Sequence, residues 1–209
     1  MKTILDIQNW NRKEHFEFFG SFEEPFFGMT FKIDCTKSFL DAKANNISFF
    51  AVYLHKILVA VNAIEAFRYR IIGNDVVVFD KINASATIGR IDKTFGFSQI
   101  EFDPDFDRFS DNLATEIARI QNTSGLFTRD FDQSNLIHFS AVPWVNFSSV
   151  SHARSFKLED SCPKINVGKM TVSKKGKHKI AVSVHVHHGL MDANSVGEFA
   201  DLLQKLMFV

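Results

Sequence analysis

The stretch Val184-His185-Val186-His187-His188-Gly189-Leu190-Met191-Asp192 places three histidines at the end of an apolar run. The β-branched residues in and before it predict a buried strand, because such side chains pack well on a pleated surface. In a strand, His185 and His187 share one face and His188 lies on the other. Gly189 permits a sharp exit from the strand, and Asp192 lies just before a predicted C-terminal helix. We therefore expect a histidine held at a buried strand end, with a carboxylate close by.

Three interpretations of these histidines are open on the residues alone. They could be buried core residues, with Asp192 serving as a turn or helix-entry residue. His185 and His187 could share a metal ion, but Gly189 and Leu190 stand where a metallo-hydrolase pattern would place further ligands. A neutral imidazole could instead act as a general base, since its ordinary pKa of about 6.5 suits proton abstraction near neutrality. We favour the general base and expect no metal site.

The composition argues against several classes of partner. The chain has 209 residues, with 24 Lys and Arg against 24 Asp and Glu, so its formal net charge is zero. Affinity for nucleic-acid backbones or anionic membranes needs an excess of basic residues, so we expect neither partner. The hydrophobic content of 45% and the charged content of 23% are typical of a folded globular protein. We predict a single domain over residues 1–209.

No export signal is predicted. Residues 1–6 lack a positively charged start followed by an apolar stretch. The longest apolar stretch, Ile47–Phe67, is interrupted by polar side chains such as Lys56, and it predicts a buried helix instead of a membrane span. Cys35 and Cys162 are too few for a disulfide framework and are not spaced as a metal-binding pair. We therefore expect a cytoplasmic protein with two reduced thiols.

Phenylalanine is strongly over-represented, with 24 Phe beside 2 Tyr and 2 Trp. The excess could fill a core, line an apolar pocket or cover a subunit interface, because Phe offers a large apolar surface without a polar group. Composition does not decide between these uses. Periodicity places Phe16, Phe31, Phe109 and Phe199 at core positions.

Hydrophobic periodicity predicts an α+β fold with a mixed or antiparallel sheet packed against helices. The sequence lacks a Gly-rich phosphate loop and strict βαβ alternation, which disfavours a Rossmann or P-loop enzyme. The C-terminal helix is predicted to open with a capping box, Ser195-x-x-Glu198. Helices are expected at residues 10–19, 48–66, 106–121 and 195–208, and strands at 29–35, 67–72, 76–79, 84–91, 95–102, 136–142, 164–172 and 179–187.

Three segments carry a resemblance to a known family. His187-His188-Gly189-Leu190-Met191-Asp192-Ala193 resembles the His-His-x-x-x-Asp-Gly motif of the coenzyme-A-dependent acyltransferase superfamily. The segment from Asn9 to Phe18 resembles the N-terminal signature of the chloramphenicol acetyltransferases. Ser140-Ala141-Val142-Pro143-Trp144-Val145-Asn146-Phe147 resembles their Ser-Ala-x-Pro-Trp-Val-Asn-Phe segment. The three occur in the family's order at similar spacing, so the resemblance spans nearly the whole chain and implies a two-layer acyltransferase-like sandwich.

The resemblance implies roles for four residues. His188 would be the general base that removes the proton from an acceptor hydroxyl, which then attacks the thioester of acetyl-CoA directly. Ser140 would donate a hydrogen bond to the oxyanion of the tetrahedral intermediate; the less favoured alternative is an ordinary strand serine. Asp192 would pair with Arg12 and hold the histidine loop, although Arg12 could be a solvated helix residue.

The resemblance also implies binding residues and an assembly. Phe19 and Phe95 would line the acceptor pocket, and Lys169 would lie near the phosphate end of the coenzyme, unless it is a solvated surface lysine. The family forms homotrimers in which His188 of one subunit would face a pocket built largely by its neighbour. No metal is implied.

Several positions depart from the family's pattern. Phe19 replaces a Tyr that often contacts the antibiotic, Asn166 replaces a Thr that helps bind a water, and Met170 replaces a Tyr near the coenzyme. Each of these three changes removes a hydroxyl, and a lost hydroxyl alters the hydrogen bonding available to a substrate. Gly189 also stands where the family commonly has Ala, and Ala193 stands where the motif usually has Gly.

Three functional hypotheses follow. The first is an acetyl-CoA-dependent O-acetyltransferase that acetylates chloramphenicol and confers antibiotic resistance. The second keeps this chemistry and changes the acceptor to another hydroxylated small molecule, as the altered pocket residues suggest. The third is a non-catalytic small-molecule-binding protein of the same fold, which would have no need of an aligned base and oxyanion donor.

Overall fold

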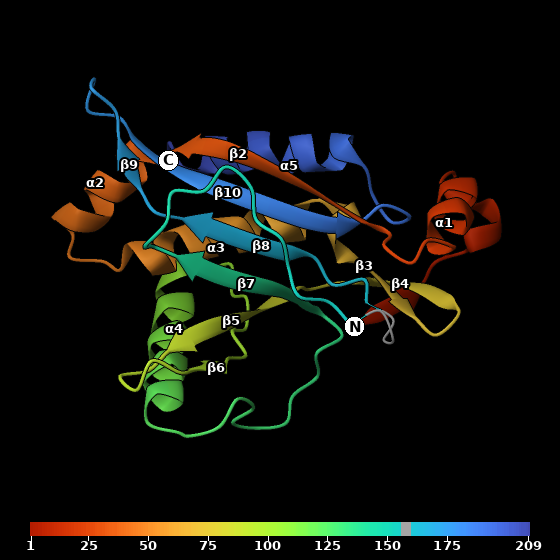
Figure 1. The fold of residues 1–209 in the computed structure, drawn as a ribbon, viewed down its shortest axis with the longest axis horizontal. Helices are drawn as coiled ribbons and strands as arrows, with labels where there is room; N and C mark the ends of the chain where they lie inside the picture. The colour runs from red at the N-terminus through yellow and green to blue at the C-terminus, as the bar shows by residue number, and fades with distance from the viewer. Residues whose placement is uncertain (156–159) are drawn as a thin grey trace.

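The computed structural model describes residues 1–155 and 160–209, in which a mixed β-sheet packs against helices (Figure 1). A smaller antiparallel sheet is formed by β1 (Lys2–Ile4), β4 (Asp75–Phe79) and β3 (Tyr69–Ile72). In spatial order, the strands of the main sheet are β2 (Phe26–Asp34), β10 (His178–His187), β8 (Lys164–Gly168), β7 (Leu136–Val142), β5 (Asn83–Gly89) and β6 (Phe95–Phe97), with β9 (Thr171–Val172) paired to β10.

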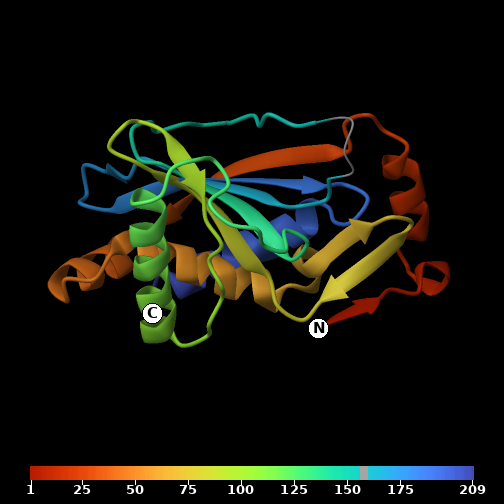
Figure 2. The same cartoon turned by 90° about the horizontal axis from the view of Figure 1, so that it is seen from below.

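Helices cover one face of the main sheet, and the segment that follows β7 crosses the other face (Figure 2). Strands β5, β7 and β8 run parallel to one another, and the remaining pairs are antiparallel, so the predicted α+β class and mixed sheet are confirmed. The helices are α1 (Lys13–Gly20), α2 (Thr36–Ala44), α3 (Phe49–Ala63), α4 (Phe106–Gln121) and α5 (Ala193–Leu206), with short 3₁₀ helices η1 (Ile7–Asn9) and η2 (Glu65–Arg68).

Side-chain alternation along β10 gives the main sheet two different faces. Val184 and Val186 are fully buried in the core shared with α3 and α5. His185 and His187 alternate with them and therefore belong to the opposite face. The neighbouring strands keep this register, because His185 pairs with Lys164 of β8. The core face is thus apolar, and the face crossed by the segment after β7 is polar.

The helices follow the predicted pattern with two corrections. α3 begins after Ser48, whose hydroxyl accepts the N–H of Ala51 at 3.4 Å. The predicted capping box of the last helix is wrong: α5 is capped by Asp192, which accepts the N–H of Asn194 at 3.0 Å. α2 was not predicted, because its buried residues include the small Ser38 and give no strong apolar periodicity. Among the described residues, no helix is long and apolar enough to cross a membrane.

Two predicted strands are shorter than expected. The strand predicted over 164–172 divides into β8 and β9, because the N–H of Lys169 donates to Val145 instead of a neighbouring strand. The strand predicted over 95–102 is regular only in β6, although the N–H of Ile100 still donates to Ala84 of β5.

Phenylalanine fills much of the core. Four Phe side chains are among the largest that are fully buried: Phe67, Phe109, Phe139 and Phe199. Phe31 is only half-buried, and its ring packs against Phe199 with 6.4 Å between centroids. Others, including Phe18 and Phe127, are exposed in the single chain. The excess therefore serves the core only in part.

We predict that Phe199→Ala lowers the free energy of unfolding by about 3–5 kcal/mol, the usual loss when a large buried side chain leaves a cavity. Urea unfolding followed by far-UV circular dichroism measures the change. Phe208→Ala removes the same ring from a site that is 52% exposed and should change stability by no more than about 0.5 kcal/mol. Equal losses in the two variants would contradict the assignment of Phe199 to the core.

Candidate active site

His188 lies in the turn directly after β10, and its backbone is hydrogen-bonded on both sides. Its N–H donates to the carbonyl of Pro25 at 2.8 Å, and Nη2 of Arg12 donates to its carbonyl at 3.1 Å. The next N–H, that of Gly189, donates to Nδ1 of His187 at 3.1 Å. The position of His188 is therefore fixed by the segment before β2, by the start of α1 and by β10 itself.

The imidazole of His188 is held between aromatic neighbours. The ring of Phe19 stacks on it with centroids 3.9 Å apart and planes within 5°, and Phe27 lies 4.6 Å away at an angle. Nδ1 of His188 is buried without a hydrogen-bond partner among the described residues. The ring is half-buried, so Nε2 is the nitrogen that is available to a reacting molecule.

Arg12 and Asp192 form an ion pair beside this turn. Nη1 of Arg12 lies 2.8 Å from Oδ2 of Asp192. Burial on its own would raise the pKa of Asp192, but hydrogen bonds from Arg12 and Asn194 outweigh it and hold the pKa below its ordinary value. Asp192 therefore stays ionised while it caps α5 and binds Arg12, and Arg12 in turn binds the carbonyl of His188.

His187 is more deeply buried than His188, and its imidazole is hydrogen-bonded to the backbone of the turn. Burial, helped by the positive charge of Arg154, lowers the pKa of His187 to about 4, so this ring is neutral at pH 7. Its Nδ1 accepts from Gly189, which places the proton of the neutral ring on Nε2. A Cβ on Gly189 would lie 3.0 Å from Cε1 of His187, so the turn passes close to this ring.

Ser140 opens into a separate, aromatic pocket on the polar face of the sheet. Its hydroxyl lies 3.2 Å from the hydroxyl of Thr87 on β5. The pocket has a volume of about 460 Å³. Five phenylalanines share its lining with Ser140: Phe95, Phe97, Phe127, Phe131 and Phe139. A hydroxyl at the wall of an apolar pocket can donate one oriented hydrogen bond to a bound molecule.

His188 does not reach the Ser140 pocket of its own chain. The register aligns Ser140 with Asn166, and Asn166 with Ser183, which is five residues before His188. A rise of about 3.3 Å per residue and two strand spacings of about 4.8 Å put the Cα atoms of Ser140 and His188 roughly 19 Å apart. A base and an oxyanion donor that act on one molecule must lie within a few ångströms of it.

The two phenylalanines that were predicted to line the acceptor pocket also lie in different places. Phe19 accompanies His188 and belongs to an aromatic cluster with Phe18 and Phe22. Phe95 lines the Ser140 pocket, where its side chain is 45% exposed. The described residues of a single chain thus contain two half-sites, one built around His188 and one around Ser140.

A family profile described as chloramphenicol acetyltransferase matches residues 1–204, which is nearly the whole chain. The chain belongs to the chloramphenicol acetyltransferase family. The predicted family is thereby confirmed.

Relatives and solved structures agree with this assignment. Chloramphenicol acetyltransferase 3 of Escherichia coli is 30% identical over 207 residues, covering 98% of this chain and 96% of the relative. The Proteus mirabilis chloramphenicol acetyltransferase is 28% identical over 204 residues, covering 97% of this chain and 93% of the relative. A solved chloramphenicol acetyltransferase structure superposes with a TM-score of 0.88 at 29% identity, covering 99% of this chain and all of that one. A probable dihydrolipoamide acetyltransferase from Listeria monocytogenes, with a TM-score of 0.65 at 12% identity, shares the fold alone.

Sequence reasoning missed a polar cluster beside Ser140. Asn166, one of the departures from the family's pattern, donates from Nδ2 to Nε2 of His152 at 2.9 Å. His152 comes from the segment that crosses the polar face, and its ring contacts His185 edge-on at 4.6 Å. Burial, and then the neighbouring His185, lower the pKa of His152 to about 4, so it is neutral at pH 7. No periodicity could signal this contact, since His152 lies outside any helix or strand.

The imidazole of His185 packs against a glycine on the neighbouring strand. A Cβ on Gly28, its partner residue on β2, would lie 2.3 Å from Nε2 of His185. The imidazole therefore lies directly against the backbone of β2. Within residues 1–155 and 160–209, no group of three or more His, Cys, Asp and Glu side chains is arranged to hold a metal ion.

Two residues from the family comparison lie just after β8: Lys169, for which the resemblance implies a contact with the coenzyme, and Met170, which departs from the family's pattern. Lys169 is exposed, and its backbone N–H is bonded to Val145 at 2.9 Å, so it lies where the crossing segment meets the strand. Met170 is half-buried and packs against the main core. Lys169 lies at neither half-site as defined by the described contacts.

We predict that His187 makes the fold sensitive to acid. Between about pH 6.5 and pH 4 the unfolded chain binds a proton at His187 and the folded chain does not, so stability falls as the pH falls. His187→Asn keeps an acceptor for Gly189 and cannot titrate. The stability advantage of the wild type over this variant should shrink by up to about 3 kcal/mol across the window. Urea unfolding at pH 7.5 and pH 4.5 measures it, and a constant difference would contradict the prediction.

Proposed function

We propose that this protein is an acetyl-CoA-dependent O-acetyltransferase that acetylates a hydroxyl of chloramphenicol and thereby confers resistance to this antibiotic. The family match over residues 1–204 carries the proposal, and relatives that it covers over 90% of their length are named chloramphenicol acetyltransferases. An aromatic pocket suits an uncharged aromatic acceptor, because apolar side chains provide most of the contact area and a few polar groups set the orientation. Acetyl-CoA is the second substrate.

In the proposed mechanism, Nε2 of His188 removes the proton from the acceptor hydroxyl. This requires the tautomer whose proton is on Nδ1, the buried nitrogen of the ring. The acceptor oxygen attacks the carbonyl carbon of the acetyl thioester and forms a tetrahedral intermediate. When the carbon–sulfur bond breaks, the coenzyme thiolate takes the proton back from His188, and the acetyl ester is released. No acyl-enzyme is formed.

Ser140 is proposed to stabilise the negative charge of that intermediate. Its hydroxyl can donate to the oxyanion while Thr87 fixes its direction from 3.2 Å. Arg12 and Asp192 are proposed to hold the turn that carries His188 and to leave the proton transfer to the histidine. Lys169 is exposed and is proposed to meet the phosphates of the coenzyme.

We further propose that the active site forms between copies of the chain in a homotrimer. The separation of roughly 19 Å between Ser140 and His188 supports a shared site, because one chain cannot bring both to one substrate. Exposed aromatic side chains at both half-sites, such as Phe18 and Phe127, also support it, since a subunit contact would cover them. The chain would act as a single domain in the cytoplasm, where acetyl-CoA is available.

A second candidate keeps the chemistry and changes the acceptor. Phe19 offers no hydroxyl beside His188, and the amide of Asn166 is already bonded to His152. These features favour an acceptor that makes fewer polar contacts than chloramphenicol does in relatives that carry Tyr and Thr there. Rapid, saturable acetylation of chloramphenicol at micromolar concentrations would reject this second candidate.

We predict that His188→Ala lowers kcat by about 10²–10⁴-fold, the usual contribution of a general base. Release of free thiol from acetyl-CoA in the presence of chloramphenicol measures the rate. His15→Ala, at an exposed position of α1, is the matched control and should keep the wild-type rate. Equal rates in His188→Ala and wild type would exclude His188 as the base.

We predict that two inactive variants complement each other. Ser140→Ala should lower kcat by about 10²–10³-fold. When His188→Ala and Ser140→Ala chains are unfolded, mixed in equal amounts and refolded together, random assembly gives about one quarter of the sites an intact histidine and an intact pocket. Activity should recover to about that fraction of the wild type. A site contained in one chain would show no recovery, as would each variant refolded alone.

A further inference from the structure

The loop between α4 and β7, residues 122–135, builds one wall of the Ser140 pocket. Phe127, Phe131 and Gln133 of this loop line the pocket together with Ser140. The loop contains no helix or strand, apart from a single bridge between Phe127 and Phe97. Loops of this length without regular structure are uncommon in folded domains and usually have a function. Its side chains can line a defined pocket only if other contacts hold its backbone.

The first half of the loop is held by Arg90 and by β6. Arg90 donates from Nη2 to the carbonyl of Gly125 at 2.7 Å and from Nε to the carbonyl of Ile120 at 2.9 Å. The N–H of Phe97 donates to the carbonyl of Leu126 at 2.9 Å. These bonds fix the backbone just before Phe127, but they do not reach the residues that follow it.

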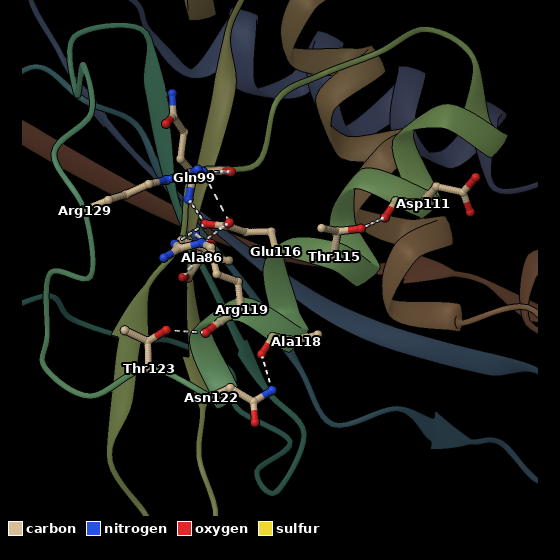
Figure 3. Close-up of polar contacts among 11 residues, drawn as sticks. Ala86, Gln99, Asp111, Thr115, Glu116, Ala118, Arg119, Asn122, Thr123 and Arg129 are labelled. Carbon is tan, nitrogen blue, oxygen red and sulfur yellow. Dashed lines mark hydrogen bonds and ion pairs between the residues drawn. The ribbon is translucent and has the colours of Figure 1, made fainter.

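The second half of the loop is held by a buried carboxylate on α4 (Figure 3). Glu116 is only 7% exposed, and its carboxylate accepts Nε of Arg119 at 2.8 Å and the N–H of Gln99 at 2.8 Å. Arg129 reaches across from the loop, and its Nη2 lies 3.2 Å from Oε2 of the same carboxylate. One anionic group thus joins α4, the segment after β6 and the pocket loop.

The charge on Glu116 makes this junction specific. Burial raises the pKa of Glu116, but hydrogen bonds from Arg119 and Gln99 and the charge of Arg129 outweigh it, so the pKa lies below its ordinary value. A buried carboxylate is stable only when donors surround it. Arg129 is the only one of these three donors that belongs to the loop. Among them, it alone joins the loop to the carboxylate of Glu116.

We infer that Arg129 is a positioning residue for the acceptor pocket: its ion pair with Glu116 holds the 122–135 loop so that Phe127 and Phe131 line the pocket beside Ser140. We expect the pair to affect the acceptor in particular, because Phe127 and Phe131, the loop residues on either side of Arg129, line the Ser140 pocket in which the acceptor is proposed to bind. The inference rests on the proposed function for its effect on catalysis. Its effect on the loop stands independently.

The kinetic test compares three variants of the full-length, assembled protein. Arg129→Gln removes the charge, and KM for chloramphenicol should rise about 3- to 5-fold, the range expected when a partly exposed ion pair is lost. KM for acetyl-CoA and kcat should change by less than about 2-fold, which separates positioning from a general loss of structure. Arg129→Lys keeps the charge and should restore KM. Arg108→Gln breaks an exposed ion pair with Asp103 at the other end of α4 and should behave as wild type.

Hydrogen exchange of the same variants tests the loop without catalysis. Amides of residues 126–131 should exchange faster in Arg129→Gln than in wild type, and at the wild-type rate in Arg129→Lys and Arg108→Gln. Unchanged exchange in Arg129→Gln would overturn the inference, as would an equal rise of KM for both substrates. If the wild type acetylates no hydroxylated acceptor, the proposed function fails, and the exchange rates still decide whether Arg129 holds the loop.

Discussion

The register of β10 between β2 and β8 is the constraint on which the rest of the structure depends. Its valines enter the core shared with α3 and α5, and the residues between them form a polar face. A slip by one residue would exchange the two faces and bury His185 and His187 among aliphatic side chains. The same register sets the end of the strand, and so decides that His188 leaves the sheet where Pro25, Arg12 and Phe19 can contact it.

That register also separates Ser140 from His188, the two residues proposed to act in catalysis. Ser140 belongs to the middle of the polar face and His188 to its edge, so each is supported by its own neighbours: hydroxyl and aromatic side chains for Ser140, an ion pair and ring stacking for His188. In the proposed shared site, the placement of the base relative to the oxyanion donor would depend on how these two surfaces meet.

The sequence predicted the parts of this protein that local pattern controls. The helix over α4 and the buried strand before His188 follow from apolar spacing. Local pattern did not predict features that depend on contacts between residues far apart in the sequence. The last helix is capped by Asp192 and not by Ser195, and Asp192 is held by Arg12, 180 residues away. Pairing of Glu116 with Arg129, and of Asn166 with His152, joins segments that share no periodicity. The site motifs could be recognised, but the separation of their residues required the sheet.

The close approach of His185 to Gly28 has a consequence for how this protein can diverge. A methyl group at position 28 would overlap the imidazole of His185 where it now lies, so the ring would have to move to make room. The two residues lie 157 positions apart in the chain and form one steric unit. A larger residue at position 28 therefore requires either another orientation of the imidazole or a smaller side chain at position 185, and the effect of a substitution at one position depends on the residue at the other.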